Sequence, residues 1–463
     1  MCGIVGATAQ RDVTDILIEG LRRLEYRGYD SAGVAVVSGG VLKRERSVGK
    51  VQKLAELVAE KQVNGPLGIA HTRWATHGEP SVRNAHPQVS GNIAIVHNGI
   101  IENFMELREM LKKEGYEFTS DTDTEVMVHL VNFYRRTEPS LIKAVQRAVR
   151  DIRGSYGAAL ISSDEPGHLV VARKGSPLVI GLGIGENFVA SDQIALLPVT
   201  RRFIYLEEGD TADITRTSVK VFDCDDNPVI REAHESDVVT DSIDKRGYRH
   251  FMLKEIYEQP EAVRRTIEGG FSSEHFLPAV FGHDAAATLP KVRHVKIVAC
   301  GTSYHAGLVA RYWLEKYAGV SCSVEIASEY RYRQSVTMPD SLFVAISQSG
   351  ETADTQAAVR LARKQGYMSV AAICNVPGST LVRESDLCFL TRAGVEIGVA
   401  STKAFLTQLA ALMMLTGALG SANGHLDAAT EKQLIEALKS LPSDIEKALS
   451  LDSITESLAA RFL

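Results

Sequence analysis

The sequence predicts an α/β protein made of two parts that contain different kinds of sheet. In the first half, short strands alternate with turns, which indicates two sheets with helices on the outside. In the second half, mostly apolar strands alternate with helices, a pattern typical of a parallel sheet covered on both faces. The polar segment 231–247 lies between the two patterns and is predicted to be an inter-domain linker.

The composition and charge exclude several classes of protein. Of the 463 residues, 45% are hydrophobic and 23% are charged, as in ordinary globular proteins. The formal net charge of −6 provides no basic field for nucleic acid or an anionic membrane. The six cysteines form no Cys-x-x-Cys pair, which favours a reducing cytoplasm. We expect no signal peptide, and the apolar run 405–419 is too short to span a bilayer and is predicted to be a buried helix.

The chain begins with MCGIVG, a cysteine followed by a short strand. If Met1 is removed, Cys2 carries both a thiol and a free α-amine, which are a nucleophile and a candidate base in one residue. An ordinary buried cysteine is the alternative interpretation. Helices are predicted over 14–25, 50–61, 103–114 and 124–136, and strands at 34–37, 93–96, 157–162, 168–173, 178–182, 187–191 and 202–205.

Two loops of the first half are candidates for function. The segment 68–80, GIAHTRWATHGEP, runs from a strand into a loop dense in His, Arg and Trp, although a passive surface loop remains open. Asn98-Gly99 forms a tight-turn signal that can present a side-chain amide beside a backbone N–H. From the residues alone, Asp121 and Asp123 are predicted to cap the helix that follows.

Two strand-to-helix turns of the second half are rich in hydroxyl groups. Strands are predicted at 296–300, 323–326, 341–347, 369–375 and 387–390, with helices at 301–316, 353–365, 401–418 and 451–462. The turns are 301–303 and 347–352, and a helix N-terminus with added hydroxyls suits a phosphomonoester. No Gly-Lys-Ser/Thr occurs there, so the turn is not a P-loop. Simple helix capping by Ser349 or Thr352 is the alternative.

The motifs in combination resemble two known domains. MCGIVG, EYRGYDSAG, HTRWATHGEP, VHNGIIEN and SDTDTE resemble the class II, or N-terminal-nucleophile, glutamine amidotransferase domain. GTSYHAG, SQSGETADT, CNVPGS and GVASTKAF resemble a sugar isomerase (SIS) domain. In this order they are similar to the glutamine–fructose-6-phosphate aminotransferase, or glucosamine-6-phosphate synthase, family. The resemblance implies an αββα amidotransferase domain followed by a doubly wound parallel-sheet SIS domain.

The resemblance also implies a role for each matching residue. Cys2 is expected to attack the side-chain amide of glutamine with its α-amine as base, and Asn98 and Gly99 to stabilise the oxyanion. Arg73, Thr76, His77 and Asp123 are expected to bind glutamine, which replaces the capping interpretation of Asp123, and Trp74 to gate ammonia. The residues expected to bind fructose 6-phosphate are Thr302, Ser303, Ser347, Gln348, Ser349, Thr352, Val399 and Ser401.

The implied organisation has four parts. They are an amidotransferase domain at 2–230, a linker and the start of the isomerase half at 231–285, a first SIS domain at 286–426, and the start of a second SIS domain at 427–463. The family's isomerase Glu, His and Lys belong to the remainder of that second domain, so the alternative expectation for this chain is glutaminase activity with sugar-phosphate binding only. The expected enzyme is a cytoplasmic homodimer that uses no metal or cofactor and binds no nucleic acid or membrane.

Two rival functions are disfavoured by the motifs. An asparagine synthetase needs an ATP pyrophosphatase loop, and an amidophosphoribosyltransferase needs an acidic pair at a strand end, which 342–347 lacks. A non-enzymatic sugar-phosphate sensor normally carries a helical DNA-binding module, whereas the first half here is rich in strands and begins with Cys2.

Overall fold

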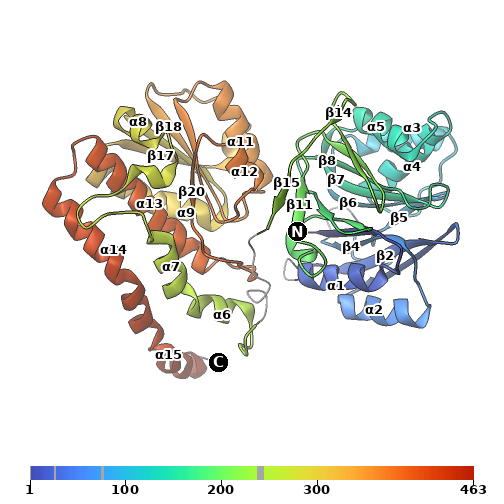
Figure 1. Cartoon of the computed structure of the whole chain (residues 1–463), viewed down its shortest axis with the longest axis horizontal. Coiled ribbons are helices and arrows are strands. Elements are labelled where there is room, and N and C mark those ends of the chain that lie inside the picture. The colour runs from blue at the N-terminus through green and yellow to red at the C-terminus, as the bar shows by residue number, and fades with distance from the viewer. Residues whose placement is uncertain (1, 26–27, 75–77, 237–244, 463) are drawn as a thin grey trace. The chain divides into compact units, whose positions relative to one another are not determined.

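The computed structural model describes residues 2–25, 28–74, 78–236 and 245–462 (Figure 1). The chain divides into two compact units, Met1–Thr240 and Asp241–Leu463. Each unit has its own sheets and its own hydrophobic core, so each is described by itself.

The first unit contains two antiparallel sheets. The eight-stranded sheet has the order β15 (Ala233–Glu235), β11 (Arg202–Tyr205), β9 (Val179–Leu182), β10 (Asn187–Ala190), β1 (Gly3–Thr8), β4 (Leu67–Arg73), β2 (Ser31–Ser38) and β3 (Val41–Val48). The seven-stranded sheet has the order β14 (Pro228–Val229), β13 (Val219–Phe222), β12 (Thr211–Ile214), β8 (Leu169–Lys174), β7 (Gly154–Ser162), β6 (Ile93–Ile101) and β5 (Gln88–Ser90).

The two sheets pack face to face, and helices cover their outer faces. The core between them joins Ile4 and Ile69 of the first sheet to Val96 and Ile161 of the second. Helices flank the sheets on opposite sides in Figure 1: α1 (Thr14–Leu24) and α2 (Val51–Glu60) on one side, and α3 (Phe104–Lys113), α4 (Asp123–Arg135) and α5 (Leu141–Asp151) on the other. The αββα arrangement expected from the resemblance is therefore confirmed.

The predicted helix at 14–25 shows why the local pattern succeeds. Leu17, Leu21 and Leu24 lie on one face of α1 and are all fully buried. β1 is buried along its whole length, with β4 on one side and β10 on the other. A helix with an apolar stripe and a central strand with no polar face are the elements that sequence periodicity identifies best.

The structure adds several elements that the sequence did not indicate. They are α5, the edge strands β3, β14 and β15, and two inner strands, β13 and β12, of which β12 pairs with β8. β15 lies inside the segment 231–247 that was predicted to be a linker, and it pairs with β11 through Phe203 and His234. Short edge strands exist only through their pairing partners, so their own sequence carries little signal.

The second unit is built around a five-stranded parallel sheet. Its order is β17 (Ser321–Ile326), β16 (His294–Ala299), β18 (Ser341–Ser347), β19 (Ser369–Cys374) and β20 (Leu387–Leu390). The helices of this unit are α6 (Phe251–Tyr257), α7 (Gln259–Ile267), α8 (Ala285–Thr288), α9 (Gly301–Trp313), α10 (Ala327–Tyr330), α11 (Ala353–Lys364), α12 (Thr380–Arg383), α13 (Lys403–Ala422), α14 (Ala428–Leu449) and α15 (Asp452–Ala459).

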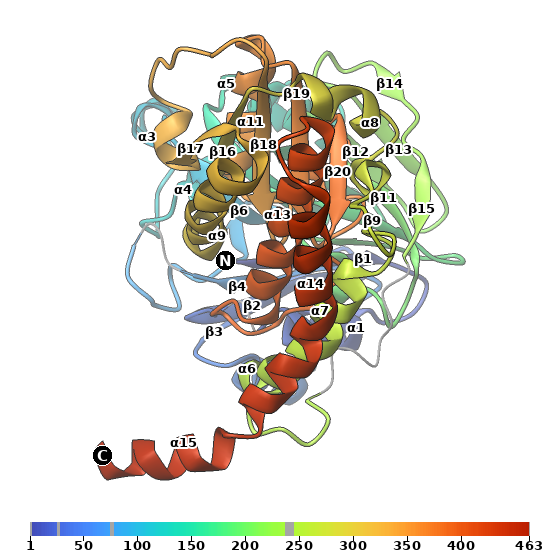
Figure 2. The ribbon, with the colours of Figure 1, turned by 90° about the vertical axis from the view of Figure 1, so that its left-hand side faces the viewer.

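Both faces of this sheet are covered. One core joins the sheet to α7, α9, α13 and α14, and a second core joins it to α10 and α11. The doubly wound arrangement predicted for the second half is therefore confirmed. Figure 2 shows α14 beside α7 and α13, and Ile435 and Leu438 of α14 lie in the first core.

The apolar run 405–419 lies in α13 and is buried as predicted, but α13 extends beyond that run to 20 residues, so the helix is not too short to span a bilayer. Among the described residues, one helix, α13, has the length and composition to cross a membrane, and 72% of its most apolar window is buried in this unit. Such burial is typical of the core helix of a globular domain.

Candidate functional site

Cys2 is held at the start of β1 by the neighbouring strand β4. The register pairs Gly3 with Thr72, which brings Cys2 beside the end of β4. The backbone N–H of Trp74 donates a hydrogen bond to Cys2 Sγ over 3.2 Å. Burial raises the pKa of the thiol, and this outweighs the opposing effects of that N–H and of the Arg73 charge. A base that accepts the thiol proton is therefore needed near neutral pH.

Asn98 on β6 presents its side-chain amide next to Cys2. Its Nδ2 donates to the carbonyl oxygen of Cys2 at 3.2 Å, and its Oδ1 lies 2.9 Å from His71 Nε2. His71 is fully buried, and burial lowers its pKa to about 3, so the ring is neutral. A neutral His71 that donates from Nε2 fixes which end of the Asn98 amide faces Cys2.

The residue after Asn98 has to be glycine. Gly99 has φ 130°, and a Cβ there would lie 2.1 Å from the carbonyl oxygen of Ser155 on β7. Any side chain at this position would separate β6 from β7, because Gly99 pairs with Tyr156 in that ladder. This glycine therefore keeps a strand interior close-packed at the point where the site lies.

Arg73 and Asp123 place two opposite charges in this unit, and both side chains are buried. Arg73 ends β4; its Nη2 donates to the carbonyl oxygen of Gly78 at 3.1 Å, and its Nη1 lies 4.0 Å from Asp30 Oδ1. Asp123 is the first residue of α4, and its Oδ2 accepts a hydrogen bond from the N–H of Ile101 at 2.9 Å.

The capping interpretation of Asp121 and Asp123 is wrong. Thr122 occupies the N-cap position of α4, and its hydroxyl accepts the N–H of Glu125. Asp123 instead reaches across to Ile101, two residues beyond Gly99, and so joins the start of α4 to the end of β6. The local sequence could not distinguish the two arrangements, because a strand 22 residues away supplies the donor.

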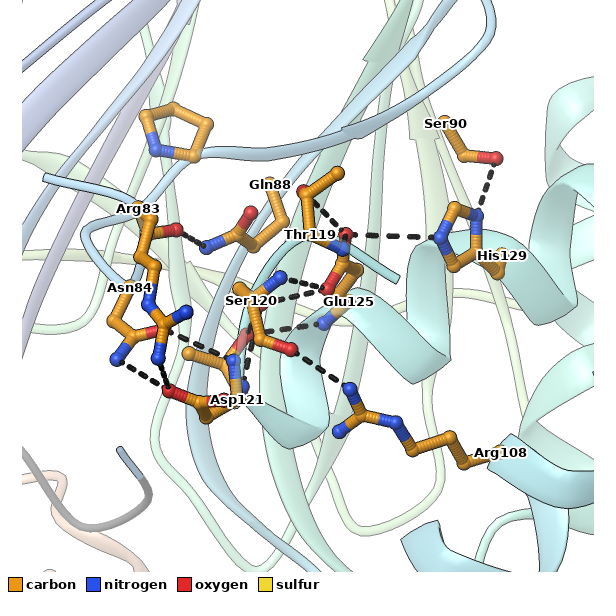
Figure 3. A network of polar contacts seen from close by, with 12 residues as sticks. Arg83, Asn84, Gln88, Ser90, Arg108, Thr119, Ser120, Asp121, Glu125 and His129 are labelled. Atoms are coloured by element: carbon orange, nitrogen blue, oxygen red, sulfur yellow. Dashed lines mark hydrogen bonds and ion pairs between the residues drawn. The ribbon is translucent and has the colours of Figure 1, made fainter. Parts of the chain in front are cut away.

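A buried polar network holds the turn before α4 (Figure 3). The Glu125 carboxylate accepts hydrogen bonds from the N–H and hydroxyl groups of Thr119 and of Ser120. Burial alone raises the pKa of Glu125, but these bonds and the nearby His129 imidazole, whose Nε2 lies 3.8 Å from Glu125 Oε1, lower it to about 2. Arg108 binds the carbonyl oxygen of Ser120 from α3. The N-terminus of α4, and with it Asp123, is thus rigidly placed.

Of the residues predicted for this site, one is exposed at its edge and two lie outside the described residues. Trp74 is 53% exposed at the end of β4, so its indole faces solvent in this unit. Thr76 and His77 lie outside the described residues. Sequence reasoning gave no role to His71; the signal that points to it is the need of a half-buried asparagine for a donor to its side-chain carbonyl oxygen.

The hydroxyl-rich turns meet where the order of the second sheet reverses. β16 lies between β17 and β18, so the chain proceeds in opposite directions across the sheet from the β16–β18 pair. Ala299 and Ile346 are partners in that pair, which places Thr302 and Ser303 beside the turn after Ser347. Ligands of open α/β sheets bind outside the carboxyl ends of strands at such a switch point.

The turn 347–352 is internally organised. Ser347 Oγ accepts the N–H of Gly350 at 3.0 Å and lies 3.2 Å from Thr352 Oγ1. Ser349 Oγ accepts the N–H of Glu351 at 3.2 Å. Thr352 occupies the N-cap position of α11 without a side-chain capping bond, so the simple capping alternative fails for Thr352.

The segment 374–379, with the sequence CNVPGS, begins at the last residue of β19 and packs against this turn. Gly350 has φ 67°, and a Cβ there would lie 2.0 Å from Ser379 Oγ and 2.8 Å from Cys374 Sγ. Glu351 Oε1 accepts the N–H of Thr380 at 2.7 Å. The backbone of the turn therefore comes closer to its neighbour than any residue with a side chain would allow.

Val399 and Ser401 lie on the segment that precedes α13. Val399 is 83% exposed, and Ser401 Oγ donates to Glu396 Oε2 at 3.0 Å. The same stretch is connected to the hydroxyl turn through Asn375, whose Nδ2 donates to the carbonyl oxygen of Gly394 and whose N–H donates to that of Gln348. Within the described ranges, no group of three His, Cys, Asp or Glu side chains is arranged to hold a metal ion.

Comparisons with known proteins agree with both units. The family model "Glutamine amidotransferase domain" matches residues 71–198, and the model "SIS domain" matches residues 288–418. A glutamine–fructose-6-phosphate aminotransferase (isomerizing) of Haemophilus influenzae is 62% identical over 463 residues, which are 100% of this chain and 76% of the relative. One from Shewanella oneidensis is 60% identical with the same coverage.

A solved structure also matches part of this chain. The C-terminal domain of glucosamine-fructose-6-phosphate aminotransferase from Francisella tularensis is 52% identical, covers 46% of this chain and 60% of that chain, and has a TM-score of 0.46. The fold and the matches define an amidotransferase joined to a sugar isomerase domain. The chain belongs to the glutamine–fructose-6-phosphate aminotransferase family.

Proposed function

We propose that this chain forms glucosamine 6-phosphate and glutamate from fructose 6-phosphate and glutamine. Family membership over its full length supports this reaction. The observation that carries the glutaminase half is the arrangement of Cys2, whose thiol lies against the N–H of Trp74 and whose carbonyl binds the Asn98 amide. A nucleophile beside a fixed amide donor is what acyl transfer to a thiol requires.

In the first step, the Cys2 sulfur attacks the side-chain amide carbon of glutamine. The α-amine of Cys2, freed by removal of Met1, accepts the thiol proton. A C–S bond forms, and Asn98 Nδ2 and the Gly99 N–H stabilise the oxyanion, a contribution whose loss costs about 10²–10³ in kcat. The C–N bond then breaks as the nitrogen takes the proton and leaves as ammonia. Water hydrolyses the thioester to glutamate and restores the thiol.

Glutamine is held by complementary charges. Arg73 binds the α-carboxylate and Asp123 the α-ammonium group, while Thr76 and His77 line the same pocket and Trp74 gates the passage of ammonia. The burial of Arg73 and Asp123 supports these roles, because charge-assisted hydrogen bonds are strongest away from water.

Fructose 6-phosphate binds at the switch point of the second sheet. The phosphate contacts the hydroxyls and backbone of the two turns, supplied by Thr302, Ser303, Ser347, Gln348, Ser349 and Thr352, and the sugar lies near Val399 and Ser401. The free N–H groups at the start of α9 and α11 support an anion in this place.

We further propose that the amidotransferase domain spans 2–230 and the first SIS domain 286–426, with 231–285 between them and the start of a second SIS domain at 427–463. The enzyme works in the cytoplasm as a homodimer without nucleic acid, membrane, metal or cofactor. Six unpaired cysteines and a net charge of −6 support the reducing compartment and the absence of nucleic acid. Analytical ultracentrifugation tests the dimer.

Incubation of the pure chain with both substrates tests the reaction. We expect glutamate and glucosamine 6-phosphate in equal amounts, measured by chromatography. Glutamate without any amino sugar would contradict the proposed synthase reaction while leaving the glutaminase half intact. Neither product, from a protein that unfolds cooperatively on heating, would contradict both halves.

A further inference from the structure

Asn84 connects Arg73 and Asp123, the two buried charged residues that are proposed to bind glutamine. The role inferred for Asn84 rests on that proposed function. The residue lies in the segment between β4 and β5 and is fully buried. Its side chain makes three hydrogen bonds. Nδ2 donates to the carbonyl oxygen of Glu79 at 3.0 Å and to Asp121 Oδ2 at 3.2 Å, and Oδ1 accepts the N–H of Asp121 at 2.9 Å.

One side of this connection leads to Arg73. Glu79 is adjacent in the chain to Gly78, whose carbonyl oxygen accepts a hydrogen bond from Arg73 Nη2 at 3.1 Å. Asn84 is thus one hydrogen bond and one peptide unit from the carbonyl that orients the Arg73 guanidinium. A guanidinium recognises a carboxylate through a planar fork, so its orientation decides whether two parallel bonds can form.

The other side leads to Asp123. Asp121 lies two residues before Asp123, and its backbone N–H and carboxylate are both bound by Asn84, as Figure 3 shows. Glu125 holds the preceding residues, Thr119 and Ser120, through their N–H groups. The turn that carries Asp121 therefore cannot move independently of the start of α4.

The peptide units on both sides of Asn84 are held by hydrogen bonds. The carbonyl oxygen of Arg83 is bound by Arg46 Nη1 at 3.0 Å and by Gln88 Nε2 at 3.1 Å. The carbonyl oxygen of Ala85 is bound by the same two side chains. The peptide units on both sides of Asn84 are thereby anchored to β3 and β5, so its amide acts as a rigid spacer.

We propose that Asn84 is a positioning residue that sets the spacing of Arg73 and Asp123 and thereby fits the site to a free α-amino acid. The carboxylate and ammonium groups of an α-amino acid leave the same carbon, so two protein charges must be held at one separation to bind both. Productive constellations require placement within about 0.5 Å, which supporting hydrogen bonds supply.

The test compares glutaminase kinetics of Asn84 variants with the reactivity of Cys2. Asn84→Ala is expected to raise the KM for glutamine about tenfold or more, since charge-assisted bonds are misplaced, with kcat changed less than about threefold. Iodoacetamide carries neither an α-carboxylate nor an α-ammonium group. Its rate of alkylation of Cys2, followed by mass spectrometry, is expected to stay within about twofold of the original rate.

Arg83→Ala is the matched control. Arg83 also pairs with Asp121, but its side chain is 57% exposed, and exposed ion pairs contribute little. We expect an unchanged KM for this variant. Asn84→Asp is nearly isosteric but loses the donor to Glu79 and to Asp121 and sets two carboxylates against each other, so it is expected to raise the KM as well. Combining it with Asp121→Asn restores an amide–carboxylate pair with the roles exchanged, and part of the affinity should return.

The outcomes distinguish the positioning role of Asn84 from the proposed glutamine site. An unchanged KM in Asn84→Ala, together with a raised KM in Arg73→Lys, would overturn the positioning role and leave the glutamine site standing. An unchanged KM in Arg73→Lys would overturn the glutamine site itself. Loss of Cys2 alkylation together with the raised KM would make the role of Asn84 merely structural and overturn the inference. If Asn84→Ala does not fold, Asn84→Asp carries the same comparison.

Discussion

The thiol of Cys2 is placed where it can react but does not ionise easily. Burial raises its pKa, while the Trp74 N–H and the Arg73 charge oppose this only in part. In the proposed reaction, catalysis near neutral pH therefore depends on a base, and the free α-amine of Cys2 is the candidate that needs no other side chain. Removal of Met1 then becomes part of the chemistry.

Cys2→Ala is expected to abolish glutamate release, because the proposed acyl intermediate forms on the Cys2 thiol. The measurement is glutamate formed from glutamine, and cooperative thermal unfolding like that of the wild type shows that the variant still folds. Active wild-type protein should lack Met1 in its mass spectrum. Glutamate release by pure Cys2→Ala protein, or full activity with Met1 retained, would refute the assignment.

Arg73→Lys is expected to raise the KM for glutamine more than it lowers kcat. A lysine keeps the positive charge but loses the planar fork, and the lost contact mainly weakens binding of the ground state. Steady-state kinetics of glutamate release give both constants. Arg83→Lys, on an exposed side chain, is the control for a change of the same kind elsewhere on the unit. A lowered kcat with an unchanged KM would contradict the proposed contact between Arg73 and the glutamine α-carboxylate.

At the scale of elements, α6 acts on the proposed sugar site from outside the sheet. Glu255 on α6 is buried and accepts the N–H groups of Ile397 and Gly398. Glu258, which directly follows α6, binds Lys403 Nζ at 2.6 Å and lies 3.5 Å from Lys254 Nζ. The segment that bears Val399 and Ser401 is thus fixed at both of its ends.

Glu255→Ala is therefore expected to weaken fructose 6-phosphate binding about tenfold, because each lost hydrogen bond to a charged group costs roughly 1.5–3 kcal/mol and only part of this reaches the ligand. Glu255→Gln keeps one carbonyl acceptor and should lose less. Calorimetric titration gives the dissociation constant. Glu261→Ala removes an exposed carboxylate from α7 and serves as the control. Equal affinity in Glu255→Ala and Glu261→Ala would contradict the role of α6.

At the scale of the whole molecule, the first unit carries buried groups that make its stability depend on pH. Burial lowers the pKa of His71 to about 3 and keeps the ring neutral. Hydrogen bonds lower the pKa of Glu125 to about 2 although burial opposes them. In both cases the unfolded chain binds more protons than the folded unit on acidification, so the free energy of unfolding falls as the pH falls.

The pH range over which stability is lost follows from the pKa values of His71 and Glu125. The contribution of His71 is expected to decline from about pH 6.5 towards pH 3, and that of Glu125 from about pH 4.5 towards pH 2. The chain has two tryptophans, so in a Trp313→Phe variant the fluorescence of Trp74 follows the first unit alone. In that background His71→Asn should flatten the loss of stability between about pH 6.5 and pH 4.5. The exposed His234→Asn is the control, and equal slopes in the two variants would contradict the prediction.

Much of this protein can be determined from the sequence alone, because the signals are local. The leucines of α1, the unbroken apolar strands of the second half and the hydroxyl-rich turns each lie within a few residues, and they indicate the two kinds of sheet. The order of the motifs identifies the family. Residue chemistry makes Cys2, Asn98 and the turn at 347–352 candidates for function, and the resemblance to the family implies the role of each.

Only the tertiary structure decided which groups support the site. Asp123 bonds to Ile101 rather than capping a helix, His71 orients Asn98 across 27 residues, and Asn84 spans 37 residues to Asp121. The short strands β13, β14 and β15 likewise form only because another strand offers them hydrogen bonds. Periodicity and turn chemistry act within one turn or strand. A hydrogen bond between distant segments depends on how the sheets stack, and no local pattern contains that information.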